Sequence, residues 1–377
     1  MFGFRLNLAL DSASFHPWGM ASEAHMDTVE SAIESIRNGE LVIVVDDPSR
    51  ENEGDLVVAA SKVTPEHVNT MIRDARGIVC VPMQAPRLRQ LGLGAMVPEN
   101  REVHSTAFTI SVDAAEGITT GVSAYDRART ISLLADPSVG PEAFVQPGHL
   151  FPLQARSGGV LERAGHTEAA VDLASLAGLV PAGVICEILN EDGTSARLPE
   201  LIEFKKKKGL KMISVAQLIE YRYQRETLVR KIEERPVETM AGAFGLHVYE
   251  SVLDKRRHFA FTKGVLTGEP TLVRMHSESL LKDVFSGGDA PEVSGALRKI
   301  AEAGTGAFVY ITQPHGGFEF SKPEKGEQLP LRQVGIGSQI LAQLGLKKLR
   351  LLTSHPDRQV VGVDGFGVDV VEALPLK

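Results

Sequence analysis

The 377-residue sequence contains only two cysteines and has no uninterrupted apolar run long enough to cross a membrane. Cys80 and Cys186 are far apart and form no paired motif, so we expect neither a disulfide framework nor a cysteine-based metal site. The apolar stretch at the start is too short for a signal peptide, which makes the cytoplasm the expected location. Basic residues are also few. With 40 Lys and Arg against 48 Asp and Glu, the net charge of −8 argues against a partner such as nucleic acid or an anionic membrane.

The residues that are present suit a soluble globular protein, with 43% hydrophobic and 23% charged residues. A chain of this length corresponds to two domains of ordinary size. Strand-like and helix-like segments alternate loosely, which predicts an α/β (mixed α+β) class in which each domain is a mixed sheet with packed helices. We expect a tail over residues 1–26, a first domain over 27–223, a charged linker over 224–235 and a second domain over 236–377.

Hydrophobic periodicity and cap residues locate the individual elements. Asp27 is expected to cap a helix that ends at Gly39, and Pro65 is expected to open another helix. Further helices are expected over 123–136, 166–179 and 335–346. The expected strands cover 41–45, 55–60, 77–83, 106–114, 148–155, 182–189, 306–313 and 347–354.

The segment 46–56, DDPSRENEGDL, places five acidic residues and Arg50 between two apolar runs. Closely spaced carboxylates repel one another, so a fold tolerates them best where a cation or a polyhydroxyl ligand lies among them. A solvated acidic turn is the simpler alternative. Because strand-like sequence flanks the segment on both sides and Gly54 permits a tight turn, we expect a ligand site here.

Two more glycine-containing turns lead into regular elements. Residues 147–149, Pro-Gly-His, enter a strand, and residues 157–167, SGGVLERAGHT, lead into a helix whose first turn carries His166 and Thr167. A helix N-terminus offers free N–H groups and a favourable field to a phosphate or an enolate oxygen. Glu187 interrupts an apolar strand, where a carboxylate is costly unless it is paired or used in chemistry.

Each of these residues also has a purely structural explanation. His166 could cap its helix, His149 could pack beside Phe151, and Glu187 could pair with an arginine. Asp172 is expected on the polar face of its helix. No P-loop, dinucleotide-binding glycine motif, G-x-S-x-G or H-E-x-x-H is present as a competing site.

Four segments together resemble 3,4-dihydroxy-2-butanone 4-phosphate synthase of riboflavin biosynthesis; they are 46–56, 108–131, 148–155 and 158–197. The resemblance covers residues 27–223 nearly without gaps. It implies conversion of D-ribulose 5-phosphate into L-3,4-dihydroxy-2-butanone 4-phosphate and formate by a homodimer. It also implies Mg²⁺ as the cofactor, with two ions per active site, and hard cations stabilise the enediolate that the reaction requires. Because a histidine ligand is softer than Mg²⁺ prefers, Mn²⁺ is the expected substitute.

The resemblance assigns roles to single residues. Glu51 and His166 are the implied metal ligands, and His149 and Glu187 are the implied proton-transfer residues, which suit general acid–base catalysis. The implied substrate-binding residues are Arg50, Glu51, Asp55, Arg163, Ala164, Gly165, His166, Thr167 and Glu187.

The chain departs from the family pattern at two positions. Gln146 stands where an arginine is usual, and Ser195 stands where a methionine is common. Neither is an implied ligand, so these departures bear on substrate affinity and leave the reaction type unchanged.

Residues 236–377 resemble GTP cyclohydrolase II less closely, through segments 273–288, 335–360 and 365–376. That family's zinc requires three thiolates, and the corresponding positions here are Ser279, Ala290 and Glu292. The family's nucleotide-contacting segment contains an arginine, and the corresponding residues 313–320 here, QPHGGFEF, contain none. We therefore expect no zinc and no hydrolysis of GTP.

Two alternatives remain for the second domain. One is a bifunctional chain that also opens GTP, and the other is a domain that binds a partner or regulates the first. His276, His315 and His355 are available as metal ligands, but their spacing follows no ligand pattern.

Overall fold

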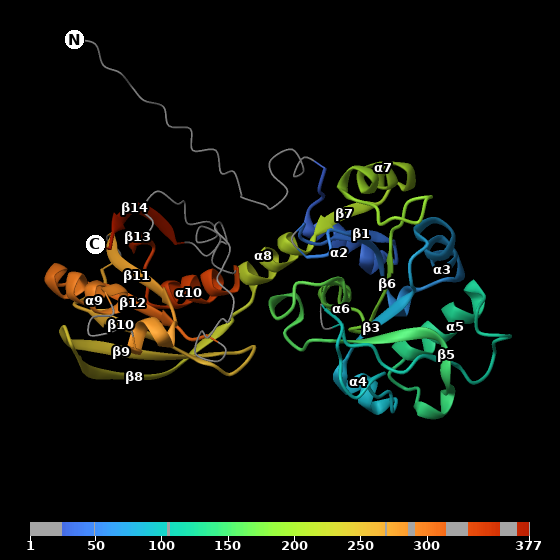
Figure 1. Ribbon diagram of the computed structural model, residues 1–377, viewed down its shortest axis with the longest axis horizontal. Helices are drawn as coiled ribbons and strands as arrows, with labels where there is room; N and C mark the ends of the chain where they lie inside the picture. The colour runs from blue at the N-terminus through green and yellow to red at the C-terminus, as the bar shows by residue number, and fades with distance from the viewer. Residues whose placement is uncertain are drawn as a thin grey trace, which may run out of the picture. The chain divides into compact units, whose positions relative to one another are not determined.

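The computed structural model describes residues 25–48, 50–103, 106–267, 270–285, 291–313, 331–354 and 368–376. The chain divides into two compact units, 1–221 and 222–377, and each contains one seven-stranded mixed sheet with helices (Figure 1). The predicted α/β class is thereby confirmed. Within the described ranges, no helix has the length and apolar character needed to span a bilayer. The tail expected over 1–26 lies almost wholly outside these ranges.

The sheet of the first unit has the strand order β4-β5-β3-β6-β2-β1-β7. Its strands are β1 (Val42–Val45), β2 (Gly54–Ala59), β3 (Cys80–Gln84), β4 (Val112–Ala114), β5 (Phe144–Ala155), β6 (Gly183–Glu187) and β7 (Lys211–Ser214). Its helices are α2 (Val29–Asn38), α3 (Pro65–Thr70), α4 (Ala85–Gln90), α5 (Ala124–Ala135), α6 (His166–Leu176), α7 (Leu198–Lys208) and α8 (Val215–Arg225). The pairs β1–β7 and β3–β5 are parallel, and the other pairs are antiparallel.

Helices cover both faces of this sheet, which explains why its central strands are apolar without alternation. Every residue of β1 and β2 is buried. Alternate residues such as Leu56 and Val58 pack into one core with Val68 of α3 and Ile131 of α5. Helix α6 packs against β2, β3 and β6 and against α2, and it brings its first residue to the β1–β2 loop.

Helix α2 begins one residue later than the sequence predicts. Thr28 is its N-cap and accepts a hydrogen bond from the Ser31 N–H at 3.2 Å. The Asp27 carboxylate instead accepts from the Met212 N–H of β7 at 2.9 Å. Both residues are good caps, and only the tertiary position of β7 decides between them. The helix ends at the left-handed Gly39, as predicted.

The strand predicted over 106–114 is mostly absent. Only β4 forms a ladder with β5, while Phe108 and Thr109 make isolated bridges to Leu153 and Ala95. The segment therefore exchanges partners along its length, which an apolar pattern does not reveal.

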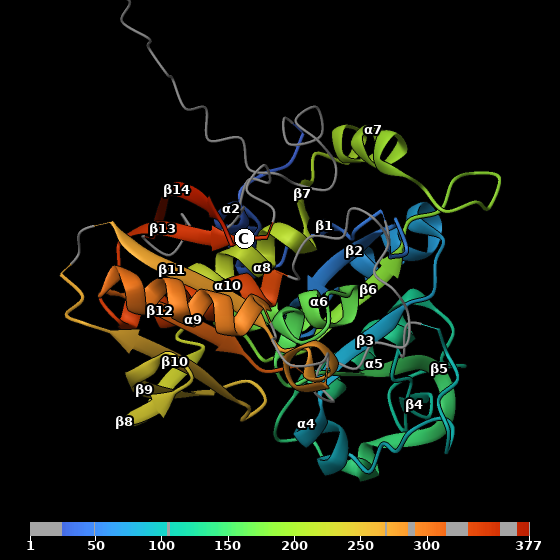
Figure 2. The same cartoon turned by 60° about the vertical axis from the view of Figure 1, so that its left-hand side comes forward.

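The sheet of the second unit has the order β14-β13-β11-β12-β10-β9-β8 (Figure 2). Its strands are β8 (Val229–Thr239), β9 (Gly242–Ser251), β10 (Arg257–Lys263), β11 (Thr271–Ser277), β12 (Gly306–Ile311), β13 (Lys348–Thr353) and β14 (Asp369–Pro375), and its helices are α9 (Pro291–Ala303) and α10 (Leu331–Gln343). Ala307 and Val309 of β12 share a core with Ile340 of α10, whereas Phe308 packs with Leu297 of α9. Because side chains alternate along a strand, the two helices cover opposite faces.

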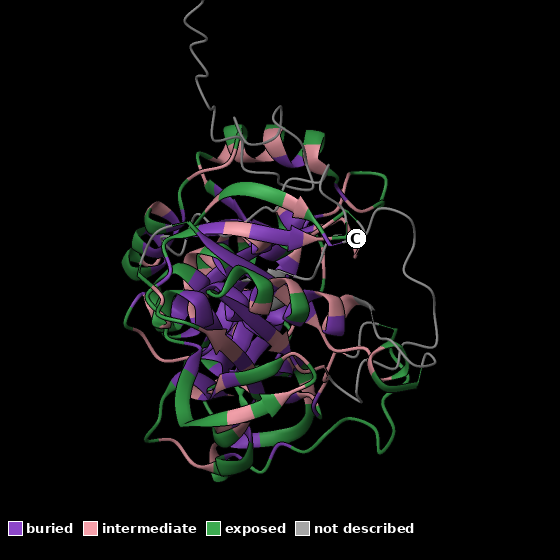
Figure 3. Cartoon of the chain, turned by 90° about the vertical axis from the view of Figure 1, so that its left-hand side faces the viewer, coloured by how far each residue is buried: buried purple, intermediate pink, exposed green. Residues whose placement is uncertain are grey.

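The charged segment 224–235, which we expected to be a linker, lies largely in regular structure. Helix α8 runs to Arg225 and β8 begins at Val229. Strand β8 is an edge strand and is exposed over most of its length, which explains its charged composition. Buried residues are instead concentrated in the inner strands (Figure 3).

Candidate active site

The loop between β1 and β2 is organised by Asp46, whose side chain is fully buried. Its carboxylate accepts hydrogen bonds from the N–H groups of Glu51 at 3.1 Å and Glu53 at 2.9 Å, and it pairs with Arg50 Nη1 at 2.8 Å. The loop turns at Asn52, which is left-handed with φ 56°. Asp46 was not among the predicted site residues. Its signal is an aspartate at the end of a strand, placed to bond the N–H groups of its own loop.

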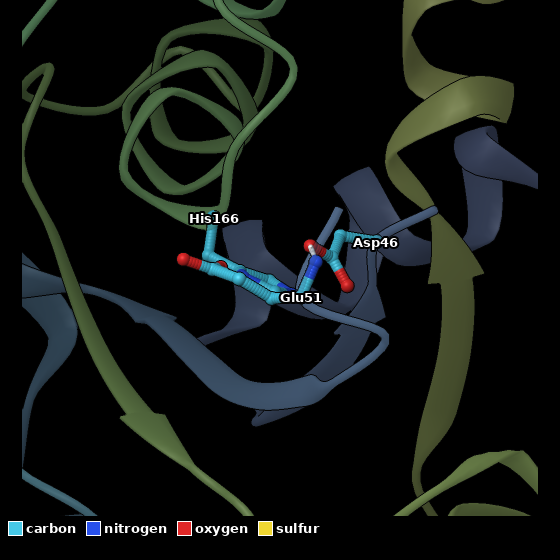
Figure 4. A group of neighbouring side chains, drawn as sticks. All are labelled: Asp46, Glu51 and His166. Carbon is cyan, nitrogen blue, oxygen red and sulfur yellow. Dashed lines mark hydrogen bonds and ion pairs between the residues drawn. The ribbon is translucent and has the colours of Figure 1, made fainter. Parts of the chain in front are cut away.

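His166 is the first residue of α6 and faces this loop. Its Nδ1 atom lies 3.7 Å from a Glu51 carboxylate oxygen and 3.9 Å from Asp55 Oδ1. The imidazole is buried, and its Nε2 atom has no hydrogen-bond partner in the described part of the chain. Asp46, Glu51 and His166 point toward one another (Figure 4). The two metal ligands implied by the sequence are therefore brought together.

This cluster fits a divalent cation. Asp46, Glu51 and His166 each offer one ligand atom, and these atoms lie within 4.8 Å of one another. Carboxylate oxygens are the ligands that Mg²⁺ and Mn²⁺ prefer, and one imidazole is compatible with Mn²⁺ in particular. Two buried atoms beside this cluster, His166 Nε2 and Asp55 Oδ1, have no hydrogen-bond partner in the described part of the chain, and a bound cation would compensate such buried polar groups.

Burial and charge shift the ionisation of Asp55 and His166 strongly. Burial raises the pKa of Asp55 to about 8, against the opposing attraction of His166. Burial disfavours the His166 cation, but the negative charges of Asp55 and Glu51 outweigh it and raise the pKa of His166 to about 9. A proton on His166 and a divalent cation both compensate the same carboxylates, so they compete for the site.

The turn before α6 brings two guanidinium groups together. Arg163 Nη1 pairs with Glu168 at 2.7 Å, and Arg163 Nη2 donates to Thr106 Oγ1 at 2.9 Å. A side-chain carbon at Gly165 would lie 2.6 Å from Arg163 Nη1 and 3.1 Å from Arg50 Nη2, so both groups converge on the N-cap of α6. This N-terminus suits an oxyanion such as a phosphate. The predicted substrate-binding residues in this turn are Arg163, Ala164, Gly165, His166 and Thr167.

Glu187 lies at the end of β6, directly opposite Asp55 of β2 in the antiparallel ladder. Its carboxylate accepts a hydrogen bond from the Ile78 N–H at 2.8 Å. The partner of this carboxylate is thus a backbone amide and not the arginine that the structural explanation required. Glu187 is also only half-buried, because it is the last residue of its strand.

His149 forms a pair with a buried aspartate. His149 Nδ1 lies 2.6 Å from Asp113 Oδ2, and the His149 N–H donates to Asp113 Oδ1 at 2.9 Å. Gly121 packs against this pair with φ 86°, and a side-chain carbon there would lie 2.2 Å from Asp113 Oδ2. Asp113 was missed at the sequence level. Like Glu187, it is a carboxylate within an apolar strand, and this was the available signal.

His149, Glu187 and Asp55 lie in one row across the sheet. Cys80 of β3 pairs with Phe151 of β5 and with Ile185 of β6. His149 lies two residues before Phe151 and Glu187 two residues after Ile185, which puts both at the same end of the sheet. Both side chains therefore leave the same face, with one strand between them, about 10 Å apart at the backbone. Asp55 extends the row to the carboxylate–histidine cluster. No described contact joins His149 to that cluster directly.

Asp113→Asn should lower turnover by about 10-fold to 10²-fold, because the amide no longer fixes the imidazole in the tautomer that leaves Nε2 free to accept a proton. The measurement is kcat for formate release from D-ribulose 5-phosphate, in the variant and in the parent, at saturating Mg²⁺. Asp172→Asn is a suitable comparison, since Asp172 lies on α6 and accepts from the Val160 N–H, away from this histidine. Equal turnover in Asp113→Asn and the parent would show that Asp113 serves only the fold.

In the second unit, Ser279 and Glu292, which stand where the cyclohydrolase family has zinc-binding thiolates, take part in a polar cluster. Asp283 accepts from the Ser279 N–H at 2.9 Å and from the Tyr310 hydroxyl at 2.8 Å, and it faces His276 Nε2 at 2.9 Å. The other ring nitrogen of His276 lies 3.7 Å from Glu292. Both nitrogens of this histidine therefore face carboxylates. Ala290, His315, His355 and residues 314–320 lie outside the described residues.

Comparison with known families first defines the class. Residues 30–221 match the family described as 3,4-dihydroxy-2-butanone 4-phosphate synthase, and residues 230–375 match the family described as GTP cyclohydrolase II. The fold and the carboxylate–histidine cluster thus define a two-domain enzyme of riboflavin biosynthesis. More particularly, the chain belongs to the 3,4-dihydroxy-2-butanone 4-phosphate synthase family, with its synthase domain fused to a GTP cyclohydrolase II domain.

Two proteins named RibBA are similar to this chain over nearly its whole length. Riboflavin biosynthesis protein RibBA of Aquifex aeolicus is 49% identical over 380 residues, covering 94% of this chain and 93% of the relative. RibBA of Bacillus cereus is 46% identical over 371 residues, covering 93% of each chain.

Among solved structures, RibBX of A. baumannii, a two-domain 3,4-dihydroxy-2-butanone 4-phosphate synthase, is 39% identical with a TM-score of 0.78, covering 93% of this chain and 99% of its own. A 3,4-dihydroxy-2-butanone 4-phosphate synthase in complex with two magnesium ions is 41% identical with a TM-score of 0.50, covering 53% of this chain and 98% of its own.

Proposed function

We propose that the first unit converts D-ribulose 5-phosphate into L-3,4-dihydroxy-2-butanone 4-phosphate and formate in a metal-dependent reaction. The observation that carries this proposal is the convergence of Asp46, Glu51 and His166 beside the two guanidinium groups at Gly165. A cation site next to an anion site is what a sugar phosphate with vicinal hydroxyls requires.

The residues divide into three roles. Glu51 and His166, with Asp46 as the third ligand, would hold a divalent cation, which when bound lowers the pKa of substrate hydroxyls and stabilises negative charge on oxygen. Arg50 and the turn 163–167 bind the phosphate, and Asp55 orients the sugar. Support comes from the position of these groups around a single loop and a single helix start, where Asp46, Asp55 and His166 are buried.

His149 and Glu187 transfer protons. With Nδ1 of His149 facing Asp113, the Nε2 atom is the one that accepts a proton from a carbon next to the substrate carbonyl. Glu187, fixed by the Ile78 N–H, handles a second proton on the same face of the sheet. Their different surroundings, a half-exposed imidazole and a carboxylate held by an amide, allow the two groups to act in opposite directions.

We expect two cations per active site, Mg²⁺ or Mn²⁺, with no zinc. A relative's structure that contains two magnesium ions supports this number, and the oxygen-rich ligand set supports these metals.

Removal of divalent cations with EDTA should abolish formate release from ribulose 5-phosphate, because substrate oxygens then lack the charge that stabilises them. Readdition of Mg²⁺ or Mn²⁺ in excess of the chelator should restore the rate. The measurement is formate in a coupled assay before chelation, after it and after readdition. Activity that persists in EDTA at the original rate would refute the roles given to Glu51 and His166.

We further propose that the chain works as a homodimer in the cytoplasm, with the surface around His149 as the contact. Large apolar side chains are exposed there, namely Ile78, Val122, Tyr125 and Val145. Val145 pairs with Asp113, and Val122 follows the glycine that packs on the His149 pair, so these two residues lie beside His149. Exposed apolar surface of this kind marks a protein contact. Light scattering on the purified chain tests it, and a monomer at micromolar concentration would exclude it.

For the second unit we propose a non-catalytic role as a dimerisation or regulatory domain. Residues 222–377 contain no cysteine, and Ser279 and Glu292 replace two thiolates of the cyclohydrolase pattern. Both ring nitrogens of His276 already face carboxylates. The alternative, a second unit that opens GTP, is favoured by the similarity to RibBA relatives across both units.

A further inference from the structure

The loop that carries Glu51 is held on its outer side by the segment just before α7. Arg197 Nη1 donates to the carbonyl oxygen of Glu51 at 2.8 Å and also to that of Asn52. Ser195 Oγ donates to Glu53 Oε1 at 2.6 Å, and Arg197 Nη1 lies 4.0 Å from the same carboxylate oxygen. Two side chains from a segment about 145 residues away thus grip three consecutive loop residues.

The two anchors of this loop are complementary. Asp46, on the inner side, accepts from backbone N–H groups of Glu51 and Glu53. Arg197, on the outer side, donates to the backbone carbonyls of Glu51 and Asn52. Backbone donors and acceptors of the turn are therefore satisfied from opposite sides, and a non-glycine residue is held in the left-handed conformation at its centre.

We infer that Arg197 is a positioning residue for the cation-binding carboxylate of Glu51, and that Ser195 supports it through Glu53. Arg197 bonds the backbone carbonyl of Glu51 itself. Loss of the guanidinium therefore frees the residue whose carboxylate binds the cation, and not only the neighbouring loop. This inference rests on the proposed metal-dependent reaction and names residues to which that reaction gives no role.

Position and charge make opposite predictions for Arg197. Its guanidinium is a positive charge close to a cation site, so by charge alone its removal strengthens cation binding. By position, its removal weakens cation binding, because residues that hold metal ligands typically contribute 10-fold to 100-fold in affinity. The sign of the change therefore separates the two effects.

The test is the dissociation constant for Mn²⁺, measured by electron paramagnetic resonance titration of the full chain. Arg197→Ala should weaken Mn²⁺ binding by about 10-fold or more, and Arg197→Lys should weaken it less, because an ammonium still donates to a carbonyl. Arg87→Ala is the matched control. Arg87 also donates to backbone carbonyls, those of Leu134 and Val139 at 3.0 Å each, but on α4 and away from the loop. Its affinity for Mn²⁺ should equal that of the parent.

Unchanged or tighter Mn²⁺ binding in Arg197→Ala would overturn the inference. The inference would also be overturned if Arg197→Ala and Arg87→Ala both weakened Mn²⁺ binding, each by an amount that follows its loss of thermal stability. If Arg197→Ala does not fold, the Arg197→Lys variant decides. An Mn²⁺ dissociation constant and a thermal stability equal to those of the parent would show that the geometry of the guanidinium has no role. Failure of the proposed function has a different signature, namely a parent chain that neither binds Mn²⁺ nor releases formate from ribulose 5-phosphate.

Discussion

Glu51→Gln should lower formate release from ribulose 5-phosphate by at least ~10²-fold and leave the protein folded. The amide keeps the size of the side chain but loses the charge that binds a cation. Stability should not fall much, because the lost ion pair between Glu51 and Arg50 is offset by relief of the repulsion between Glu51 and Asp55. A residue kept for function shows this combination of lost turnover and retained stability.

The measurement combines kcat over a range of Mg²⁺ concentrations with thermal unfolding monitored by circular dichroism. Glu191→Gln is the matched control. The Glu191 side chain is 92% exposed, and this substitution removes the same charge outside the cluster. It should retain parental turnover. If Glu51→Gln unfolds instead of losing turnover, or if both variants lose activity equally, Glu51 is structural and the cation site is wrong.

His149→Ala and Glu187→Gln should each lower turnover by at least ~10²-fold without changing the affinity for the cation. His149 is held by Asp113 and Glu187 by the Ile78 N–H, and neither is within the group of cation-binding atoms. Their loss therefore removes proton transfer and leaves cation binding intact. Glu51→Gln, by contrast, should impair both.

Turnover at saturating Mg²⁺ and Mn²⁺ affinity by paramagnetic resonance separate these outcomes. His67→Ala provides a histidine control, because His67 serves the capping box of α3 and should affect turnover little. Near-normal rates in His149→Ala and Glu187→Gln would show that both residues are structural, and a parallel loss of cation affinity would place them in the metal site.

The site shows which kinds of residue a sequence can predict. Glu51 and His166 stand in segments whose pattern resembles a known family, and the fold brings them to within 3.7 Å. Asp46 and Asp113 escaped prediction because each makes contacts that hold another residue of the site, whatever further role it has. Those contacts depend on where a loop amide or an imidazole lies in space. Arg197 is harder still to predict from the sequence, because its carbonyl partners are about 145 residues away in the chain.

The same reasoning applies to the fold. Buried strands such as β1 and β2 follow from continuous apolar runs, and Gly39 ends its helix as expected. The choice of Thr28 over Asp27 as the cap depends on β7, which takes the aspartate for its own amide. Strand β8 was mistaken for a linker because an edge strand exposed to solvent has the composition of a linker.

We propose above all that this chain acts on ribulose 5-phosphate as a metal-dependent lyase and that its second unit does not act on GTP. The most direct test of this proposal is formate released by one preparation of the full chain, given ribulose 5-phosphate with Mg²⁺ in one incubation and GTP with Zn²⁺ in another. We expect formate from ribulose 5-phosphate and none from GTP above the no-enzyme blank. No formate from ribulose 5-phosphate would contradict the proposed reaction, and formate from GTP would establish the second unit as a cyclohydrolase.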